Sequence, residues 1–401
     1  MAHAIRTTIA VVAAKDKRVL GFFPLRHLPF CVSPSTHESP ACIATNETFG
    51  HDTRVFTNGF SLGVDYRVPA FIGQNDTQER LFDMLNVFFT VDVEIWCGSW
   101  TDLEARFSEA FQRYIYGPDG HFGLPYTLDV LAEHNLLGVF FVESLFATRF
   151  GLQPLAEIVG LLHERGHEVQ LHLHPEWVDE SRTPLLKNVN GKRRLLSSFS
   201  LAEQQILIAE GLTLLRQAGG QGVNAFRAGN FGFNTATLLA LATNGIVFDS
   251  SYNARVLGLE SGVMPGTLVV EPIRCGEIFE YPVTVFNDGS HLPRPLQLTA
   301  CSYQEIEGLL WQALELGRKS FVIISHNFEL LNQARNRPDY TVIKRFHKLC
   351  RFLDQHRDCF QVRGFRELEG LAVDQQPLPL TSPMWKTGLR ICEQVMRRRY
   401  S

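Results

Sequence analysis

The stretch that most constrains the fold is residues 88–100, which read F-F-T-V-D-V-E-I-W-C-G-S-W. Apolar and polar residues alternate there, which predicts a β-strand with Thr90, Asp92 and Glu94 on one face. Two carboxylates on one face of a buried strand are costly unless a cation compensates them. The pattern suits a general base beside a metal ligand. A strand end with two solvated acids is the alternative, and four later stretches bear on the choice.

The composition indicates a soluble globular protein with a sizeable core. Of 401 residues, 45% are hydrophobic and 20% charged, enough for one large domain or two of ordinary size. The net charge of −4 gives no basic field for nucleic acid. The eight cysteines form no C-x-x-C pair, which favours a cytoplasmic enzyme over a zinc ribbon, with a periplasmic location as the alternative. No apolar run is long enough for integral membrane association.

Residues 1–83 lack a sustained period and are rich in Thr, Asn, Pro and Gly. We expect the folded domain to begin near Met84 and the preceding residues to be a poorly ordered extension. A small accessory element and a misassigned start codon are the alternatives. The apolar run at residues 7–14 ends in basic residues without a small-residue cleavage site, so no signal peptide is expected.

From Met84 onward, strand and helix patterns alternate about eight times, which predicts an α/β fold built as a parallel (β/α) barrel over residues 84–368. A doubly wound open sheet is the alternative, although no G-x-G-x-x-G follows the first strand. Residues 369–401 form a Pro-rich segment and a basic amphipathic tail helix. We expect this helix to be solvated, with an anionic surface or a partner as alternative contacts. Capping boxes are predicted at Thr101/Glu104, Ser200/Glu203 and Ser302/Glu305.

The stretch at residues 166–177, G-H-E-V-Q-L-H-L-H-P-E-W, is the second informative one. As a strand, it places His172 and His174 on one face, opposite apolar neighbours. Two imidazoles at the end of an apolar strand make a reasonable metal pair, with Glu176 just beyond. A chance H-x-H on an exposed strand is the alternative, and His167 is expected to be structural.

Three further predicted strands end in groups that carry chemistry: Arg227, Asp249 and His326. An arginine can hold a carboxylate in its ionised form. Histidine is the usual acid or base at neutral pH, and a carboxylate commonly orients it. Each group alone could be a buried structural one. Together with the two earlier stretches, all five sets fall at strand C-termini, where a barrel gathers its chemistry.

From 84 to 365, the sequence resembles the polysaccharide deacetylase (NodB-homology) family, carbohydrate esterase family four, with all five family motifs in order. T-V-D-V-E at residues 90–94 is similar to the first motif, commonly T-F-D-D-G. His172, Arg227, Asp249 and His326 match the leading residues of the other four. The resemblance implies a deformed (β/α) barrel and a divalent metal, usually zinc.

The sequence departs from the family pattern at the expected metal ligands. The family's second Asp falls at Val93, so Glu94 takes its place, and the family's second metal histidine falls at Glu176. We expect Glu94, His172 and His174 as metal ligands, with Glu176 as the alternative to His174. The proline that follows the family's arginine is also absent, because Ala228 stands there.

The resemblance implies hydrolysis of N-acetyl groups on amino sugars of a polysaccharide or its precursor. Asp92, held by Arg227, would act as base, and His326, oriented by Asp249, as acid. Aromatic residues such as Trp96, Trp177 and Phe231 could face sugar rings, although packing is the commoner role of such side chains. A small-molecule amide hydrolase of the allantoinase-like branch and a catalytically silent carbohydrate-binding barrel are the alternatives. The expected partner is a carbohydrate substrate.

Overall fold

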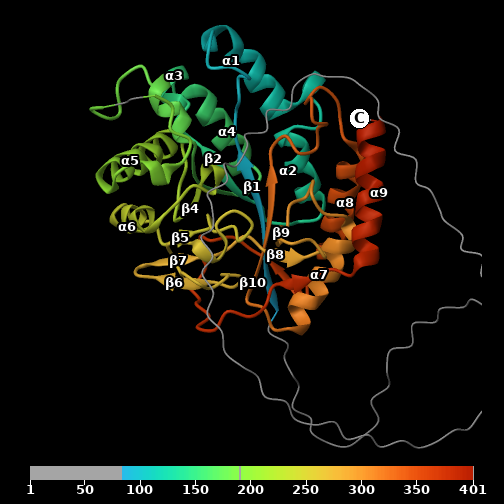
Figure 1. The fold of residues 1–401 in the computed structure, drawn as a ribbon. Coiled ribbons are helices and arrows are strands. Elements are labelled where there is room, and N and C mark those ends of the chain that lie inside the picture. Colours follow the sequence, from blue (N-terminus) through green and yellow to red (C-terminus); the bar gives the residue numbers. More distant parts are fainter. Residues whose placement is uncertain (1–83, 189–190, 401) are drawn as a thin grey trace, which may run out of the picture. The chain divides into compact units, whose positions relative to one another are not determined.

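The computed structural model describes residues 84–188 and 191–400, so the expectations for residues 1–83 lie outside the described residues. Within the described part, parallel strands run in the order β10–β1–β2–β3–β4–β5–β7. This strand order confirms the predicted α/β fold with a deformed (β/α) barrel (Figure 1). The strands of this path are β1 (Leu85–Val93), β2 (Val139–Glu143), β3 (Glu168–Leu173), β4 (Ala225–Ala228), β5 (Phe248–Asp249), β7 (Ile278–Glu280) and β10 (Ser320–His326).

Closure between β7 and β10 is irregular, which is why the barrel is deformed. After β7 the chain reaches β10 through Thr284, whose backbone N–H donates to Val322 O at 3.2 Å. Leu296 and Leu298 then form backbone hydrogen bonds with Ile324 at 3.0 and 3.1 Å. Isolated hydrogen bonds thus replace a continuous ladder at this seam. Two more strands extend the sheet: β6 (Ile273–Cys275), antiparallel to β7, and β11 (Phe360–Val362), parallel to β1.

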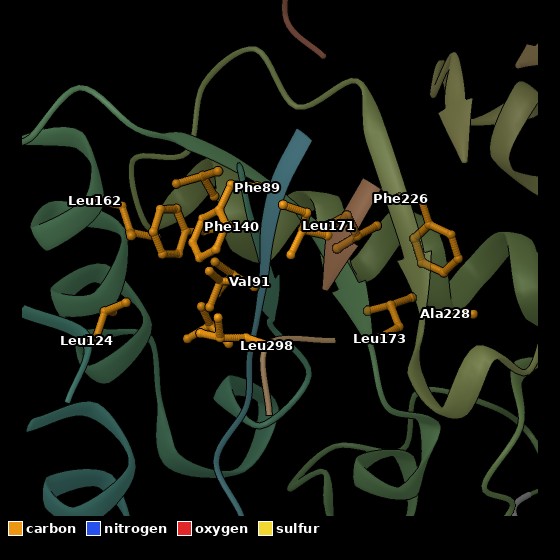
Figure 2. Close-up of a cluster of buried hydrophobic side chains, with 14 of the residues drawn as sticks. Phe89, Val91, Leu124, Phe140, Leu162, Leu171, Leu173, Phe226, Ala228 and Leu298 are labelled. Atoms are coloured by element: carbon orange, nitrogen blue, oxygen red, sulfur yellow. The ribbon is translucent and has the colours of Figure 1, made fainter. Parts of the chain in front are cut away.

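The two faces of each barrel strand carry different cores, as the alternation in β1 predicts. Phe89 and Val91 of β1 belong to the large outer cluster between strands and helices, together with Phe140, Leu171 and Phe226 of neighbouring strands (Figure 2). The opposite face fills the barrel interior with a second cluster of buried side chains. Its members are Phe88, Val139, Phe141, Ala225, Phe248, Tyr281, Val322 and Phe365.

Helices connect the strands and cover the outer cluster (Figure 1). The capping boxes predicted at Ser200 and Ser302 are present, each with reciprocal hydrogen bonds to the glutamate three residues later. The one predicted at Thr101 is wrong, because Asp102 adopts a left-handed φ of 55° and itself precedes the helix without a side-chain cap. The helices are α1 (Leu103–Phe111), α2 (Leu124–Glu133), α3 (Ala147–Phe150), α4 (Gln153–His163), α5 (Leu201–Gln217), α6 (Thr235–Thr243), α7 (Tyr303–Glu315), α8 (Tyr340–Gln355) and α9 (Met384–Tyr400).

The C-terminal helix α9 lies beside α7 and α8 (Figure 1). Its polar side faces the barrel: Arg390 pairs with Asp288 at 2.7 Å, and Arg397 pairs with Asp339. A small three-stranded sheet, β12–β8–β9, precedes it, with β8 at Val285–Asn287, β9 at Arg294–Pro295 and β12 at Leu380–Thr381. None of the helices in the described ranges is both long and apolar enough to cross a membrane.

Candidate active site

The register of the parallel strands gathers the predicted site residues at one end of the barrel. Asp92 of β1 lies directly beside His326 of β10, and His172 of β3 lies beside Arg227 of β4. These positions share the interior face with Phe88, Phe141 and the rest of the inner cluster. The interior is therefore apolar at the amino ends of the strands and polar at the carboxyl ends, where barrels place their chemistry.

A cavity of about 630 Å³ opens over this polar end. All of the predicted site residues except Arg227 and Asp249 form part of its wall. The lining residues are Asp92, Glu94, Trp96, Trp100, His172, His174, Glu176, Lys192, Arg194, Ala228, Asn230, Phe231, His326, Phe328 and Arg335. A volume of this size is in the range of small-ligand sites.

Glu94, His172 and His174 converge at the floor of the cavity. Glu94 Oε1 lies 3.2 Å from His172 Nε2 and 2.9 Å from His174 Nε2. All three side chains are buried, and one donor atom from each lies within 4.8 Å of the others. Donor atoms of a tetrahedral zinc site lie roughly 3–4 Å apart. The structure thus brings the three expected ligands together in a set of one carboxylate and two imidazoles that suits such an ion.

The other ring nitrogen of each histidine is held from behind. His172 Nδ1 donates to the backbone oxygen of Arg227 at 2.7 Å, and His174 Nδ1 lies 3.3 Å from Glu176 Oε2. This leaves both Nε2 atoms facing Glu94, the orientation that second-sphere partners impose on metal-binding histidines. Glu176 therefore lies behind His174 rather than in the donor set. Its other oxygen accepts from Asn230 Nδ2 at 3.2 Å.

Glu94 is fixed by two side chains, Trp96 and Asn327, that the sequence does not predict as its partners. Trp96 Nε1 donates to Glu94 Oε2 at 2.6 Å. Asn327 clamps the backbone: its Oδ1 accepts from Glu94 N at 3.0 Å, and its Nδ2 donates to Glu94 O at 3.2 Å. Because Asn327 directly follows His326, one turn holds both the carboxyl end of β1 and that of β10.

The charges at the floor of the cavity favour a bound cation. Burial raises the pKa of Glu94, but the charge of His174 and hydrogen bonds with His172 and His174 outweigh burial and hold it well below its usual range. Burial lowers the pKa of His174, yet Glu94, Glu176 and Glu143 raise it to about 10. Glu94 is thus held in its ionised form, and a positive charge beside it is favoured. A bound divalent cation would supply that charge in place of the imidazole proton, so these residues fit the expected metal.

Asp92 is bound by a buried arginine. Arg227 Nη1 donates to Asp92 Oδ1 at 2.7 Å, and the Arg227 side chain is fully buried. Thr90 Oγ1 accepts from the same nitrogen at 2.8 Å, and Ser250 Oγ accepts from Nη2 at 3.0 Å. The guanidinium also lies over the Phe141 ring at 4.3 Å. With all these contacts, Arg227 fixes the position and orientation of the Asp92 carboxylate.

His326 is oriented by Glu329, and not by Asp249 as the sequence predicted. His326 Nδ1 lies 2.8 Å from Glu329 Oε1. Burial lowers the pKa of His326, but the hydrogen bond with Glu329 and the charges of Glu94 and Asp92 outweigh it and raise the pKa to about 9. The imidazole is thus poised to hold a proton. A carboxylate three residues after the histidine was the available sequence signal.

Asp249 lies outside the cavity lining because of strand parity. Phe248 belongs to the inner cluster, so the next residue along β5 points to the other face. There Asp249 accepts from Ser251 Oγ and lies beside Glu280, the neighbouring position on β7. Burial raises the pKa of Asp249 to about 6, and burial with the charge of Asp249 raises that of Glu280 well above its usual range. The pair is a structural carboxyl contact.

Aromatic side chains line much of the cavity, but not all those expected. Trp96 and Phe231 are part of the wall, as are Trp100 and Phe328. Trp177 is only 1% exposed and instead packs edge-on against Trp100. The sequence prediction of Trp177 as a sugar-facing ring is therefore wrong. The lining cations Lys192, Arg194 and Arg335 lie in loops, where no periodicity marks them.

Among known proteins, the chain is similar to solved structures. No protein-family model and no curated protein matches the chain. A Mycobacterium smegmatis protein to which polysaccharide deacetylase activity is ascribed matches at 17% identity and TM-score 0.46, over 74% of this chain and 91% of its own. A family 4 carbohydrate esterase from Streptomyces lividans, in complex with acetate, matches at 13% identity and TM-score 0.35, over 73% and 99%. A Bacillus subtilis peptidoglycan deacetylase matches at 10% identity and TM-score 0.33, over 80% and 99%.

These neighbours are deacetylases and esterases of the kind that the five sequence motifs resemble. All three TM-scores lie below 0.5, so the fold assignment rests on the strand order and hydrogen bonds of the barrel itself. The chain is thus a deformed (β/α) barrel whose carboxyl end holds a carboxylate–imidazole cluster, an arginine-bound aspartate and a glutamate-bound histidine.

Proposed function

We propose that the protein is a metal-dependent amide hydrolase that removes N-acetyl groups from amino sugars of a polysaccharide or its precursor. One observation carries the proposal: three chemically distinct groups face a single cavity. They are the donor set, the carboxylate held by an arginine, and the imidazole held by a carboxylate. Amide hydrolysis needs a polarised carbonyl, a base for the attacking water and an acid for the leaving amine.

Glu94, His172 and His174 would hold the divalent cation, with zinc as the expected ion. When bound, such an ion supplies Lewis-acid polarisation of the acetyl carbonyl and of a water molecule. The chain contributes the orientation of the donors. The backbone oxygen of Arg227 keeps the proton of His172 on Nδ1, which leaves Nε2 with a free lone pair.

Asp92 and His326 would divide the proton transfers between them. Asp92, with one oxygen fixed by Arg227, accepts a proton from the attacking water. His326, kept protonated by Glu329, gives its proton to the amine nitrogen as the carbon–nitrogen bond breaks. The products are acetate and a free amino sugar. Because the two residues are neighbours across β1 and β10, both reach one bound amide.

The rest of the cavity suits a sugar. Rings of Trp96, Trp100, Phe231 and Phe328 offer apolar faces of the kind on which sugar C–H groups pack. A second cavity of about 460 Å³ shares His326, Phe328 and Arg335 with the first. The shared wall favours a ligand longer than one small amide, and therefore a glycan over the small-molecule amides of the allantoinase-like branch.

Acetate release by the metal-loaded protein tests the proposal. N-acetylated oligosaccharides would be assayed beside a panel of small ureides and amides. We expect acetate from the oligosaccharides and little turnover of the small amides. Turnover of the small amides alone would favour the small-molecule hydrolase. No turnover of any substrate, with one metal ion per chain bound, would contradict the proposal and favour a carbohydrate-binding barrel.

A further inference from the structure

Within the described residues, one of the cations that line the main cavity forms no close ion pair, and only the more distant charge of Glu94 acts on it. Lys192 Nζ pairs with Glu180 at 2.5 Å, and Arg194 Nε lies 3.6 Å from Glu176 Oε1. By contrast, no carboxylate in the described part of the chain forms an ion pair with the guanidinium of Arg335, and none of its side-chain N–H groups has a hydrogen-bond acceptor there. A half-buried charge with no close counter-charge is costly.

Aromatic rings hold the Arg335 side chain in place. Its guanidinium carbon lies 4.1 Å from the centre of the Phe328 ring and 4.6 Å from that of Tyr114. Such stacking fixes the guanidinium plane but does not neutralise its charge, and it leaves the N–H groups at the edge of the plane available. The rings thus orient the Arg335 side chain, but its N–H groups remain without hydrogen-bond acceptors among the described residues.

The backbone at Arg335 is strained to present this side chain. Its φ is +56°, a left-handed value that glycine or asparagine adopts at lower cost. Asn332 holds the turn: its backbone oxygen accepts from Arg335 N at 2.8 Å, and its Oδ1 accepts from Asn336 N at 3.1 Å. Because a glycine would suit this backbone better, the side chain must serve another purpose than closing the turn.

Arg335 lies close to the reacting groups. The Phe328 ring on which it stacks also packs against His326, with ring centres 5.2 Å apart. Arg335, Phe328 and His326 together form the wall shared by the two cavities. A group bound to Arg335 would therefore lie one aromatic ring away from the candidate acid. That distance suits a substituent on the acetylated sugar or on the adjoining unit.

We propose that Arg335 is an anion-binding subsite that selects substrates with a carboxylate or phosphate on or next to the acetylated sugar. A planar guanidinium binds either group through two parallel hydrogen bonds. The inference rests on the proposed function, which it narrows from N-acetylated glycans in general to acidic ones. Both sources of the anion, an acidic sugar and a sugar phosphate, share this chemistry.

Ligand binding, measured by calorimetry on the full chain, tests the subsite without relying on turnover. The probes are N-acetylglucosamine, N-acetylmuramic acid and N-acetylglucosamine 1-phosphate. We expect at least one acidic probe to bind the wild-type protein about 10-fold or more tightly than the neutral one, since hydrogen bonds to charged groups contribute about 1.5–3 kcal/mol. A preference for one acidic probe over the other identifies the source of the anion.

Arg335→Met removes the charge, and Arg335→Gly removes it while relieving the positive φ, so that at least one variant keeps the fold. Each variant should bind the acidic probe about 10- to 100-fold more weakly than the wild-type protein does. Its affinity for the neutral probe should change less than about twofold. The matched control is Arg337→Met, because Arg337 is an exposed arginine of the same loop that does not line either cavity. It should leave all three affinities unchanged.

Two results would overturn the subsite: equal binding of neutral and acidic probes to the wild-type protein, or an equal loss for both in the Arg335 variants. An equal loss for both probes would mean that Arg335 acts only by packing over Phe328 and Tyr114. These outcomes differ from failure of the proposed function. If the protein prefers acidic probes but releases no acetate, the anion-binding subsite is supported and the proposed hydrolase activity is contradicted. A protein that deacetylates neutral and acidic glycans alike, with or without Arg335, keeps the hydrolase and loses the subsite.

Discussion

Asp92 and His326 are direct neighbours in the register of β1 and β10, and each is held from behind by a residue of opposite charge. Arg227 comes from β4, across the barrel interior, whereas Glu329 comes from the turn that follows His326 itself. The ladder therefore sets the spacing of the candidate base and acid, and the two partners set the orientation of their side chains. Each level can be tested by itself.

Metal content of purified variants should identify the third ligand. We expect His174→Ala to lose the ion, as His172→Ala and Glu94→Ala do, because the donor set becomes incomplete. Glu176→Ala should keep the ion with affinity reduced roughly 10- to 100-fold, since Glu176 only orients the ring of His174. The measurement is metal per chain after dialysis at a fixed free-metal concentration.

The control for this series is His167→Asn, which changes a buried histidine that does not line the cavity and should keep a full complement of metal. Retention of the ion by His174→Ala together with its loss from Glu176→Ala would reverse the assignment. It would restore the family spacing, with a glutamate in place of its second histidine.

Exchange of Glu329 should show which carboxylate serves His326. Glu329→Gln keeps the shape of the side chain but removes the charge that raises the pKa of His326. The imidazole then loses its proton at lower pH, so the alkaline limb of the kcat/KM profile should move to lower pH. We also expect kcat to fall roughly 10- to 100-fold. Asp249→Asn should leave that limb in place, and a shift with Asp249→Asn alone would revive the role predicted from the sequence.

His167 should make the protein sensitive to acid. Burial and the charge of Arg165 lower its pKa to about 4, and its Nδ1 accepts from Gly138 N at 3.1 Å. In the unfolded chain His167 is protonated below about pH 6.5, whereas in the folded protein it stays neutral down to about pH 4. The free energy of unfolding therefore falls as the pH is lowered through that range. His167 alone lowers the free energy of unfolding by on the order of 2–3 kcal/mol between pH 7 and pH 4.

Urea unfolding at pH 7 and pH 4 measures this contribution. His167→Asn offers a non-titrating acceptor to the same N–H group, so the variant should lose about 2–3 kcal/mol less than the wild-type protein between the two pH values. Parallel losses in both proteins would show that other groups account for the acid sensitivity.

Much of the fold follows from local pattern. The two-residue period in β1 predicts which side chains enter the barrel, and Asp92 and Glu94 do lie on the interior face while Val91 and Val93 lie in the outer cluster. The same rule, applied to β5, would have excluded Asp249, because Phe248 is the interior residue there. The sequence prediction followed the family motif at this position instead of the parity of the strand.

The remaining site residues depend on contacts that no period encodes. Arg335 reaches the cavity from an irregular loop after β10, and its place is set by stacking on Tyr114, which lies far earlier in the chain, just after α1. The sequence offers Trp177 as a sugar-facing ring, but Trp100 packs against it and lines the cavity in its place. Which of two aromatic side chains is buried depends on how the loops pack together, and composition alone does not specify that packing.

The proposed division of acid and base is tested by comparing acetate release from the wild-type protein with that from Asp92→Asn and His326→Ala at equal metal content. The first change removes the acceptor for the proton of water, and the second removes the proton donor to the amine. We expect each change to lower kcat by about 10²–10⁴-fold while metal content and melting temperature stay near wild type. Undiminished acetate release by both variants would contradict the assignment of base and acid.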